Sequence, residues 1–514
     1  MVQSICIDCN AQNTKIKCYF NHPVNTVIAT GINAVYLNSA FDDTVAAYIN
    51  RAKYTIDIAL YNYTSNSTNV VAKIATAANA AAARGVVVRW IYDGNSTNSG
   101  LTLLNSTIKT LASPLSSSVY NIMHNKFMVI DVNSPDEEDA VVLTGSYNWS
   151  SAQTYSDYNN IVFFQDQPLA LAFYAEFNKM WGGTGPLPDY ANSRFGVNKT
   201  PSAQNIFNVN GTMVEVYFSP KDPTGIQLQN AINTSNHDLF FGIYTFTDNA
   251  IANAIKNKYN SGITVKGIMD LFSVTYSAYS VLAPVLGSNM IVYATSDLYH
   301  NKIMLIDAFS PESDPQVFTG SFNWSGAAQT KNDEHAVIIH DGKITNQFYQ
   351  SLCKDYTDLG GVPCNADPCP GKINVITSNL RGAAYQWQLN TGSGFANISD
   401  NVNDAGTSAL NLYLNNPPSS WYGYQYRCLV NGVSSDTTTV KFIAYWNGAV
   451  NTLWENPGNW NCGKIPDANT DVIINYGVPN FPFVNSTTPC KSLKMNIGSK
   501  VTVTTGNTLL IMGH

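Results

Sequence analysis

Two short segments of the chain carry the same set of reactive side chains. The segment HNKFMVID supplies His124 and Lys126, and the segment HNKIMLID supplies His300 and Lys302. On a β-strand, residues two positions apart point to the same face, so each segment would present an imidazole beside an ammonium group. One such pair is common, but two copies with the same downstream sequence are not expected by chance.

Each segment is followed, at a matching distance, by a second polar motif. The sequence GSYNWS contributes Ser146 and Asn148, and GSFNWS contributes Ser321 and Asn323. This set suits phosphodiester cleavage, because one histidine can attack phosphorus while the other protonates the leaving oxygen. Lysine and asparagine donors would stabilise charge on the phosphoryl oxygens. The motifs supply no carboxylate cluster for a metal, so we expect neither a metal nor another cofactor.

The pattern H-x-K-x(4)-D followed by G-S-x-N resembles the signature of the phospholipase D superfamily. The matching positions are His124, Lys126, Asp131, Gly145, Ser146 and Asn148 in the first copy, and His300, Lys302, Asp307, Gly320, Ser321 and Asn323 in the second. The resemblance covers roughly residues 25–355. It implies a metal-independent phosphodiesterase that works through a phosphohistidine intermediate.

The resemblance also implies a role for each motif residue. In members with two motifs the N-terminal histidine usually attacks, which makes His124 the nucleophile and His300 the acid. The motif glycines and serines, Gly145, Gly320, Ser146 and Ser321, are expected at the substrate. The aspartates Asp131 and Asp307 are expected to set local geometry rather than to touch phosphate.

The two halves differ at one position that matters for this family. Its members often carry a glutamate about ten residues after the asparagine, where it orients a histidine. The second half offers Glu334, whereas an alignment on the shared Gln-Thr pair places Tyr158 there in the first half. Asp157 or Asn160 is the expected substitute. Without one, a histidine would be less well oriented and activity would be modest or directional.

The motifs lie within a repeat of about 176 residues. In each copy an alanine-containing helix stops at a glycine, Gly85 or Gly262, and a strand then ends in Asp93 or Asp270. Strand–helix–strand order twice over predicts an α/β fold of two phospholipase D-like sandwich halves about a pseudo-twofold axis. The two half-sites would then form one site. The acidic tips after the histidine strands are expected to be solvated turns, with calcium binding as the alternative.

The chain is expected to contain four domains. The two α/β halves are predicted at 25–195 and 205–355, an immunoglobulin-like β-sandwich at 369–444 and a β-rich module at 445–514, so two small all-β domains follow the halves. The sandwich is suggested by Trp387 on a central strand and by a tyrosine two residues before Cys428, the tyrosine-corner pattern. The tryptophans of the last module either pack under loops or form a sugar platform.

The nine cysteines indicate disulfides rather than zinc, because only one CxxC unit is present. Disulfides in turn suggest a secreted protein. The pairs expected from sequence position are Cys353–Cys364, Cys369–Cys428 and Cys462–Cys490. The first residues do not have the pattern of a signal peptide, so an exported protein would be present here in its mature form. No apolar run is long enough to predict a transmembrane helix.

Composition favours some substrates over others. Only 12% of the 514 residues are charged and the net charge is −7, whereas proteins that hold nucleic acid usually show a basic face. A secreted phospholipase D acting on phospholipid headgroups, with contact to a membrane surface, is therefore favoured. An extracellular nuclease is the first alternative, and an inactive binding or adhesion protein is the second. No obligate protein partner is evident.

Overall fold

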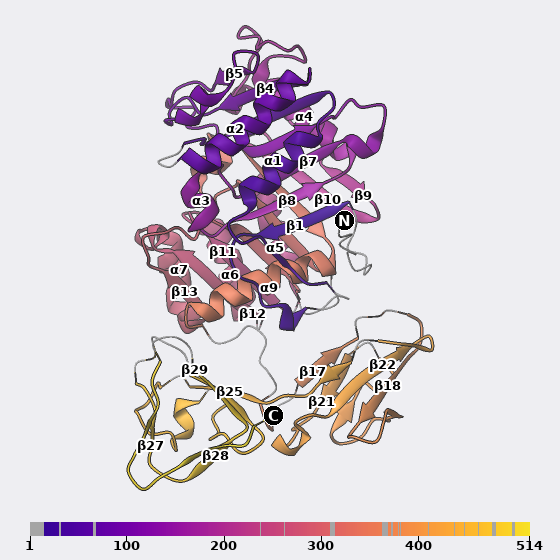
Figure 1. The fold of residues 1–514 in the computed structure, drawn as a ribbon, viewed down its shortest axis with the longest axis vertical. Coiled ribbons are helices and arrows are strands. Elements are labelled where there is room, and N and C mark those ends of the chain that lie inside the picture. The colour runs from indigo at the N-terminus through magenta and orange to yellow at the C-terminus, as the bar shows by residue number, and fades with distance from the viewer. Residues whose placement is uncertain are drawn as a thin grey trace, which may run out of the picture. The chain divides into compact units, whose positions relative to one another are not determined.

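The fold is taken from a computed structural model of the chain. It describes residues 15–29, 32–64, 68–236, 238–261, 263–308, 314–361, 369–371, 374–378, 380, 382–409, 411–435, 437–446, 448–460, 462–474, 478, 480–495 and 499–513. These residues form two compact units that divide between Asp355 and Tyr356. Figure 1 shows the ribbon, with the first unit from indigo to salmon and the second from orange to yellow.

The first unit is built on two eight-stranded mixed sheets. The order in the first sheet is β2-β1-β8-β7-β6-β3-β4-β5. Its strands are β1 (Ile16–Phe20), β2 (Val35–Tyr36), β3 (Thr55–Leu60), β4 (Val87–Tyr92), β5 (Lys109–Ala112), β6 (Lys126–Ile130), β7 (Val141–Gly145) and β8 (Asn160–Phe164). Strands β3, β4 and β5 run parallel, whereas β6, β7 and β8 form an antiparallel set.

The second sheet repeats this order. It runs β13-β12-β11-β14-β15-β16-β10-β9, so β14 stands where β6 stands in the first sheet. Its strands are β9 (Ile206–Val209), β10 (Thr212–Ser219), β11 (Asp238–Ile243), β12 (Thr264–Asp270), β13 (Met290–Tyr293), β14 (Lys302–Ile306), β15 (Gln316–Gly320) and β16 (Glu334–His340). The predicted α/β fold with two equivalent halves is confirmed.

Helices cover both sheets. The α-helices are α1 (Phe41–Arg51), α2 (Thr68–Ala83), α3 (Ser151–Tyr155), α4 (Gln167–Trp181), α5 (Thr224–Thr234), α6 (Asn249–Asn260), α7 (Ser277–Leu286), α8 (Gly326–Thr330) and α9 (Gly342–Asp358). Short 3₁₀ turns are η1 (Thr26–Ile28), η2 (Ser99–Leu103), η3 (Glu137–Asp139), η4 (Gly196–Asn198), η5 (Leu271–Thr275) and η6 (Gly287–Asn289). Within the described ranges, no helix is both long and apolar enough to cross a bilayer.

Each half has its own apolar core under its helices. In the first half α1 and α2 lie across one face of the sheet, as Figure 1 shows, and their alanine, valine and isoleucine side chains pack on buried Trp90 and Trp149. The second core includes Trp324 under α5, α6 and α7. Glycine ends α2 as predicted, since Gly85 has φ +96°, which a residue with a side chain rarely adopts.

The histidine motifs lead into the middle of the sheets. Every residue of β6 and of β14 is buried, because each strand is flanked by strands on both sides and covered on both faces. This explains why the sequence after each lysine reads as continuously apolar. The lysine that begins each strand is buried with it.

The first half begins earlier than the predicted residue 25. Strand β1 pairs with β8 in the way that β10 pairs with β16, so β1 and β10 are the equivalent strands. The segment directly before α1 forms only the two-residue edge strand β2, which lies parallel to β1.

The second unit contains two all-β modules. The strands of the first are β17 (Asn374–Thr377), β18 (Tyr385–Asn390), β19 (Ala396–Asn397), β20 (Asp404–Ala405), β21 (Asn411–Leu414), β22 (Gln425–Val430), β23 (Val433–Ser434) and β24 (Thr438–Thr439), with the turn η7 (Ser419–Trp421). They form two antiparallel sheets around buried Trp387. The hydroxyl of Tyr426 reaches Asp404 Oδ1 at 3.4 Å. The immunoglobulin-like assignment stays a prediction.

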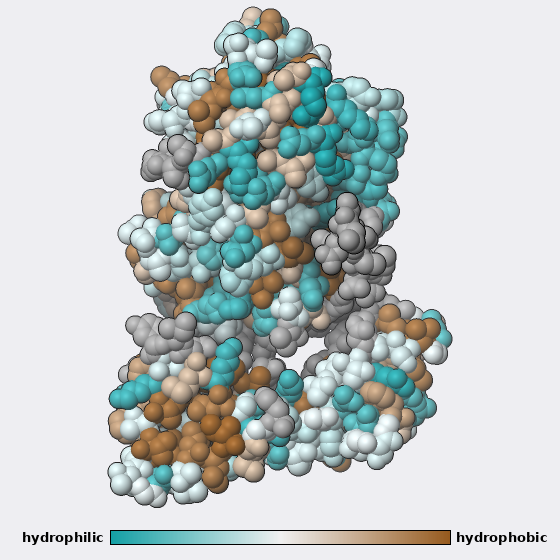
Figure 2. All heavy atoms as spheres, viewed as in Figure 1, coloured by the Kyte–Doolittle hydropathy of each residue, from teal (hydrophilic) through white to brown (hydrophobic). Residues whose placement is uncertain are grey.

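The last module is a coil of parallel strands. They are β25 (Ile443–Trp446), β26 (Asp471–Ile474), β27 (Phe483–Val484), β28 (Thr488–Cys490), β29 (Ser492–Met495), β30 (Thr502–Val503) and β31 (Leu509–Ile511), with the turn η8 (Pro457–Asn459). Each strand pairs in parallel with one that lies 19 to 28 residues away in the sequence. Figure 2 shows apolar residues gathered on one face of this module.

The three tryptophans of this module are core residues. Trp446, Trp454 and Trp460 are each at most 2% exposed, and their ring centroids lie 4.7–6.4 Å apart. Rings packed on one another in this way have no open face for a sugar. The interpretation that they pack under loops is confirmed, and the alternative of a sugar platform is wrong.

Two of the three expected disulfides are wrong. Cys369 bonds to Cys462, 93 residues away, rather than to Cys428. Cys428 lies inside β22 opposite Trp387 and is fully buried, whereas Cys369 precedes the first strand of its module. Cys490, the expected partner of Cys462, is likewise buried in β28. The third expected pair, Cys353–Cys364, includes a residue outside the described ranges.

The bond between Cys369 and Cys462 should stabilise the second unit. Closing a loop of this length lowers the conformational entropy of the unfolded chain. In the loop-entropy account this stabilises the folded state by about 4 kcal/mol. Cys369→Ser should therefore lower the melting temperature of the second unit, and adding Cys462→Ser should lower it no further. Mass spectrometry of non-reduced peptides should find Cys369 linked to Cys462. A peptide that links Cys369 to Cys428 would contradict the structure.

Candidate active site

The backbone before each histidine pairs with the opposite half. The amide of His124 donates to the carbonyl of Asp333 at 2.8 Å, and the amide of Asp333 donates to Ile122 at 3.0 Å. The equivalent contact in the other direction is made by Tyr158, whose amide donates to Leu298 at 2.9 Å. The two motif segments therefore meet along the interface between the halves, as the repeat predicted.

A carboxylate of the second half holds the histidine of the first. Nδ1 of His124 lies 2.7 Å from Oε2 of Glu334. The hydroxyl of Ser321 donates to the same oxygen at 2.8 Å, and Asn332 donates to the other at 3.0 Å. His124 is thus fixed by its Nδ1–H, which leaves the Nε2 lone pair for chemistry.

An amide of the first half holds the histidine of the second. Nδ1 of His300 lies 3.0 Å from Oδ1 of Asn159, and Ser146 donates to that oxygen at 2.8 Å. The amide of Asn159 donates in turn to Oδ1 of Asn21 at 2.8 Å. The arrangement is crosswise, since each histidine shares one oxygen with the serine of the other motif.

Asn159 is the counterpart of Glu334, a position that the sequence alignment missed. Both lie 14 residues after their motif glycine, although the Gln-Thr pairs between them are displaced by one residue. Counting from the glycine would have found Asn159. The two expected substitutes have other partners. Asp157 accepts a hydrogen bond from the amide of Leu298 at 2.9 Å, and Asn160 donates to Asn301 at 2.8 Å.

The two lysines are buried beside tyrosine rings. Nζ of Lys126 donates to the carbonyl of His124 at 2.9 Å and lies 5.1 Å from the ring centre of Tyr61. Nζ of Lys302 donates to His300 at 2.6 Å, and Tyr244 stands as Tyr61 does. Burial lowers the pKa of Lys126 to about 7 and lowers the pKa of Lys302 well below its usual value.

Both histidines favour the neutral state. Burial lowers the pKa of His124 to about 4, against the opposing effect of Glu334. Burial, Lys302, Lys126 and His124 lower the pKa of His300 well below its ordinary value. A bound phosphodiester would place a negative charge among these groups and raise the pKa of all four. The field of the site is therefore suited to an anion.

Asn148 and Asn323 present amide oxygens that no hydrogen bond satisfies within the described part of the chain. Asn148 is 6% exposed, and its backbone amide donates to Oε1 of Gln153 at 3.2 Å. An unpaired amide in a buried polar site has a strong requirement for a ligand partner. Donation from the two side-chain amides to phosphoryl oxygens stays a prediction, because the unpaired atom of each amide is an oxygen, which accepts and does not donate.

The motif glycines and serines lie behind the histidines. A side chain at Gly145 or Gly320 would collide with the carbonyl of Asn160 or His335, at 2.3 and 2.5 Å. The glycines therefore allow β7 and β15 to approach the next strand closely. Ser146 and Ser321 are fully buried against the residues that hold the histidines. These contacts indicate positioning, and direct contact of the four residues with substrate stays a prediction.

The motif aspartates lie at the far ends of β6 and β14. Asp131 adopts a left-handed φ of +50°, and its carboxylate accepts amide hydrogens from Lys53, Tyr54 and Thr55 at 2.7–2.9 Å. Asp307 has φ +49° and accepts from the amide of Asn236 in the same manner. Both close the turn that leads from a helix into a sheet, which agrees with the expectation that they set local geometry.

A second pair of aspartates supports the segment before each histidine. Asp93 at the end of β4 accepts the amide hydrogen of Met123 at 3.0 Å. Asp270 at the end of β12 accepts that of Tyr299 at 2.8 Å. The sequence marked both residues only as strand ends, because their partners are about 30 residues away.

The asparagine between each histidine and lysine faces away from the site, as predicted. Oδ1 of Asn125 lies 3.0 Å from Nδ1 of His335, and His335 also hydrogen-bonds Thr144. Asn301 and Asn160 form the matching pair in the other direction. His335, which received no role from the sequence, thus joins the two halves directly behind the catalytic residues.

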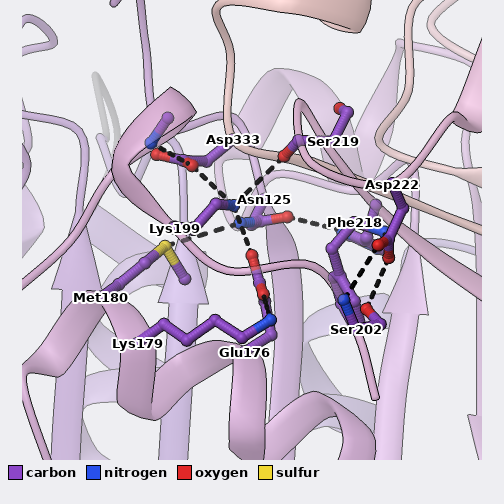
Figure 3. Close-up of polar contacts among 12 residues, drawn as sticks. Asn125, Glu176, Lys179, Met180, Lys199, Ser202, Phe218, Ser219, Asp222 and Asp333 are labelled. Carbon is purple, nitrogen blue, oxygen red and sulfur yellow. Dashed lines mark hydrogen bonds and ion pairs between the residues drawn. The ribbon is translucent and has the colours of Figure 1, made fainter. Parts of the chain in front are cut away.

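A buried ion cluster anchors the strand that carries Glu334. Lys199, from the segment between the halves, forms ion pairs with Glu176 and with Asp333, the latter at 2.7 Å, and donates to Ser219 at 3.1 Å. Figure 3 shows these contacts converging on the lysine. The two carboxylates raise the pKa of Lys199 above its usual value despite its burial. Asp333 is therefore fixed on both sides, and its neighbour Glu334 with it.

These contacts define what the site can do. It joins two neutral imidazoles, two buried cations and two unsatisfied amides, each imidazole held through Nδ1 by the opposite half. Such a site can bind a phosphodiester anion, attack it from one imidazole and move a proton with the other. The sequence placed these residues together correctly, and the structure adds Asn159, Asp93, Asp270 and Lys199.

Known proteins are similar to part of this chain. The chain is 31% identical over 153 residues to the mitochondrial cardiolipin hydrolase of Drosophila melanogaster, which covers 27% of this chain and 57% of that protein. It is 24% identical over 165 residues to the phospholipase D of Rickettsia bellii, covering 31% and 79% respectively. The chain thus spans little more than half the length of the Drosophila relative, and each match is about as long as one half.

Two solved structures also align with part of this chain. The phosphatidylserine synthase of Haemophilus influenzae aligns with 69% of this chain and 89% of its own, at 14% identity and a TM-score of 0.49. A phospholipase D family member, NUC from Salmonella typhimurium, aligns with 28% of this chain and 94% of its own, at 26% identity and a TM-score of 0.24.

Family models match both units. The model for a domain of unknown function matches residues 445–514, the last β-module. The model described as "Cardiolipin synthase, PLD-like domain" matches residues 45–181 and 228–356, one segment in each half and more than half of the chain in total. The chain therefore belongs to this phospholipase D-like family.

Proposed function

We propose that the protein is a secreted phospholipase D that hydrolyses headgroup phosphodiesters of phospholipids through a phosphohistidine intermediate. The observation that carries the proposal is the crosswise contact of each histidine with the opposite half. It makes one site from two motifs and gives the two imidazoles different partners. The family is one of phosphodiesterases, and the steps and substrate below are inferred from the residues of this chain.

In the first step Nε2 of His124 forms a bond to phosphorus. His300 holds a proton on Nε2 at this stage, because the negative charge of the bound phosphodiester raises its pKa. The bond from phosphorus to the leaving oxygen breaks, and that oxygen takes the proton from Nε2 of His300, so a neutral alcohol departs. Glu334 stabilises the positive charge that the ring of His124 acquires on phosphorylation. Lys126 and Lys302 offset the charge that builds on the phosphoryl oxygens.

In the second step a water molecule replaces the alcohol. Neutral His300 takes a proton from water while the water oxygen bonds to phosphorus, and the bond from phosphorus to His124 breaks. Both histidines return to their starting states, and the products are a phosphate monoester and an alcohol. An alcohol in place of water would give transfer of the phosphatidyl group by the same steps.

Phospholipid is the favoured substrate because of the surroundings of the histidines. The segments 113–121 and 271–289, which lead to and from the strand ends beside them, contain no Lys or Arg. A nucleic-acid strand needs such residues to neutralise the phosphates on either side of the one that is cut. Secretion is proposed from the disulfide between Cys369 and Cys462.

Substitution of either catalytic histidine should abolish turnover. We expect His124→Ala and His300→Ala each to reduce hydrolysis of bis-p-nitrophenyl phosphate by roughly 1,000-fold or more, because each histidine carries out one half of the proton and phosphoryl transfer. His22→Ala, at an imidazole stacked on Tyr158, serves as the control. EDTA should change the rate little. Full activity in either variant, or strong inhibition by EDTA, would refute the mechanism.

The partner of His300 should set the alkaline limit of activity. His300 must hold a proton to act as the acid, and its pKa is low because the ring is buried beside Lys302 and Lys126. Its neutral partner Asn159 adds no negative charge to oppose these effects. Asn159→Glu should raise that pKa by about 1 to 3 units and move the fall of kcat at high pH upward by a similar amount. Asn159→Gln, of equal size but uncharged, should not. An unchanged alkaline limit in Asn159→Glu would show that His300 is not the proton donor.

Substrate class should be decided by direct competition. Initial rates on phosphatidylcholine, cardiolipin, single-stranded DNA and RNA are compared for the wild type and for His300→Ala. We expect the highest His300-dependent rate on a phospholipid, because the segments flanking the histidines lack cations. A higher rate on either nucleic acid would favour the nuclease alternative.

A further inference from the structure

We propose that five exposed apolar side chains beside the two histidines form a contact surface for a zwitterionic phospholipid bilayer. This apolar flank consists of Leu115, Val119, Leu271, Phe272 and Tyr276, which are 69%, 58%, 49%, 47% and 39% exposed. The inference rests on the proposed phospholipase function and adds that the enzyme acts on phospholipid within a bilayer. It assigns the contact to the first unit and needs no part of the second.

On the second half, the flank begins one residue after a support of His300. Asp270, which accepts the amide hydrogen of Tyr299, also accepts that of Phe272 at 2.9 Å. Phe272 stacks on Tyr244 with ring centres 5.4 Å apart, and Tyr244 lies 5.3 Å from the ring of His300. A continuous row of rings thus leads from the catalytic imidazole to the exposed surface.

On the first half, the flank is tied to the matching aspartate. The hydroxyl of Ser113 donates to Asp93 at 3.3 Å, and the amide of Ser116 donates to Asn95 at 2.7 Å. Asn95 itself donates its amide hydrogen to Asp93 at 3.0 Å. The loop that carries Leu115 is therefore held by the same carboxylate that supports the backbone before His124.

Hydrogen bonds to neighbouring elements hold the turns that carry these exposed side chains. The hydroxyl of Ser273 donates to the carbonyl of Tyr244 at 2.6 Å and accepts the amide hydrogen of Phe246 at 2.9 Å, which fixes η5. Single exposed apolar residues are ordinary on a protein surface. The loop that carries Leu115 and the turn that carries Leu271 and Phe272 are held by the two carboxylates that also support the segments before the histidines. These side chains therefore lie beside whatever binds to the histidines.

The charges select the kind of membrane. Residues 113–121 and 271–289 contain no Lys, Arg, Asp or Glu, and the whole chain has a net charge of −7. An anionic bilayer is held by Lys and Arg, and these segments offer none. Their serine, threonine, asparagine and tyrosine groups suit the hydrogen-bonding headgroup region, and leucine, valine and phenylalanine suit the layer beneath it. A zwitterionic surface is therefore the matching occupant.

Burial of the histidines explains why such a contact is needed. His124 is 6% exposed and His300 4% exposed, while the phosphodiester of a bilayer lipid lies among packed headgroups. Phosphorus and Nε2 can meet only if the protein beside the histidines enters the headgroup layer or the lipid is drawn out of it. Apolar residues next to the site supply the first route, since their insertion is favoured by removal from water.

The test separates membrane binding from catalysis. Leu115→Ser, Val119→Ser and Leu271→Ser are combined in the His124→Ala background, so that no lipid is consumed, and binding to phosphatidylcholine vesicles is measured by flotation. We expect the lipid concentration for half binding to rise at least fivefold. Leu187→Ser with Tyr190→Ser, at positions 61% and 73% exposed in the segment between the halves, should leave it unchanged. Leu271→Trp should tighten binding.

Activity supplies the second measurement. With His124 restored, the triple variant should hydrolyse vesicular phosphatidylcholine at least fivefold more slowly and a soluble diester at the wild-type rate. Wild-type vesicle binding by the triple variant, or an equal loss on the soluble diester, would overturn the inference. Stronger binding to vesicles with phosphatidylglycerol than to pure phosphatidylcholine would overturn the choice of a zwitterionic surface.

The inference and the proposed function fail separately. Vesicle binding that depends on the apolar flank, in a protein that hydrolyses no lipid, would support the surface and reject the phospholipase. Hydrolysis of dispersed short-chain phosphatidylcholine by a protein that binds vesicles independently of the flank would support the phospholipase and reject the surface. Unchanged melting temperature of the triple variant shows that either result reflects the surface rather than unfolding.

Discussion

One oxygen on each side of the interface between the halves determines the rest of the site. Oε2 of Glu334 holds Nδ1 of His124, and Oδ1 of Asn159 holds Nδ1 of His300. Neither half contains a supported histidine by itself, so the site exists only when the two sheets pack in one register. The backbone contact between His124 and Asp333 and the buried Lys199 both serve that register.

Holding this geometry requires the burial of charge, which is costly unless each charge is compensated. Lys199 is compensated by two carboxylates, and its pKa is raised. Lys126 and Lys302 are not compensated to the same degree, and their pKa values are lowered. The contrast distinguishes a structural cation from the two that we propose to act on substrate, because a phosphodiester anion would compensate the charge of Lys126 and Lys302.

Much of the fold and most of the site follow from the sequence, because they depend on short-range pattern. The spacing of His124 and Lys126 gives a buried strand, and its repetition gives two halves. The residues that the sequence missed depend on distances that it does not contain. Asn159 was missed because the second half has one more residue before its Gln-Thr pair and the first half has one more after it, so an alignment on that pair shifts Asn159 by one position. Cys369 was paired with the wrong cysteine because Cys428 lies inside a strand, opposite Trp387.

The two halves differ where the chemistry needs a difference. A phosphodiester has two unlike ends, and a histidine that attacks phosphorus needs another environment from one that protonates an alcohol. In the proposed mechanism, the carboxylate beside His124 would stabilise a ring that becomes positive, whereas the neutral amide beside His300 would leave its proton easy to release. The segments beside the histidines also differ between the halves. Phe272 stacks on Tyr244 in the second half, whereas Asn95 occupies the equivalent position in the first half. The duplication provides two equivalent halves, and the residues that differ between the halves give the two histidines different surroundings.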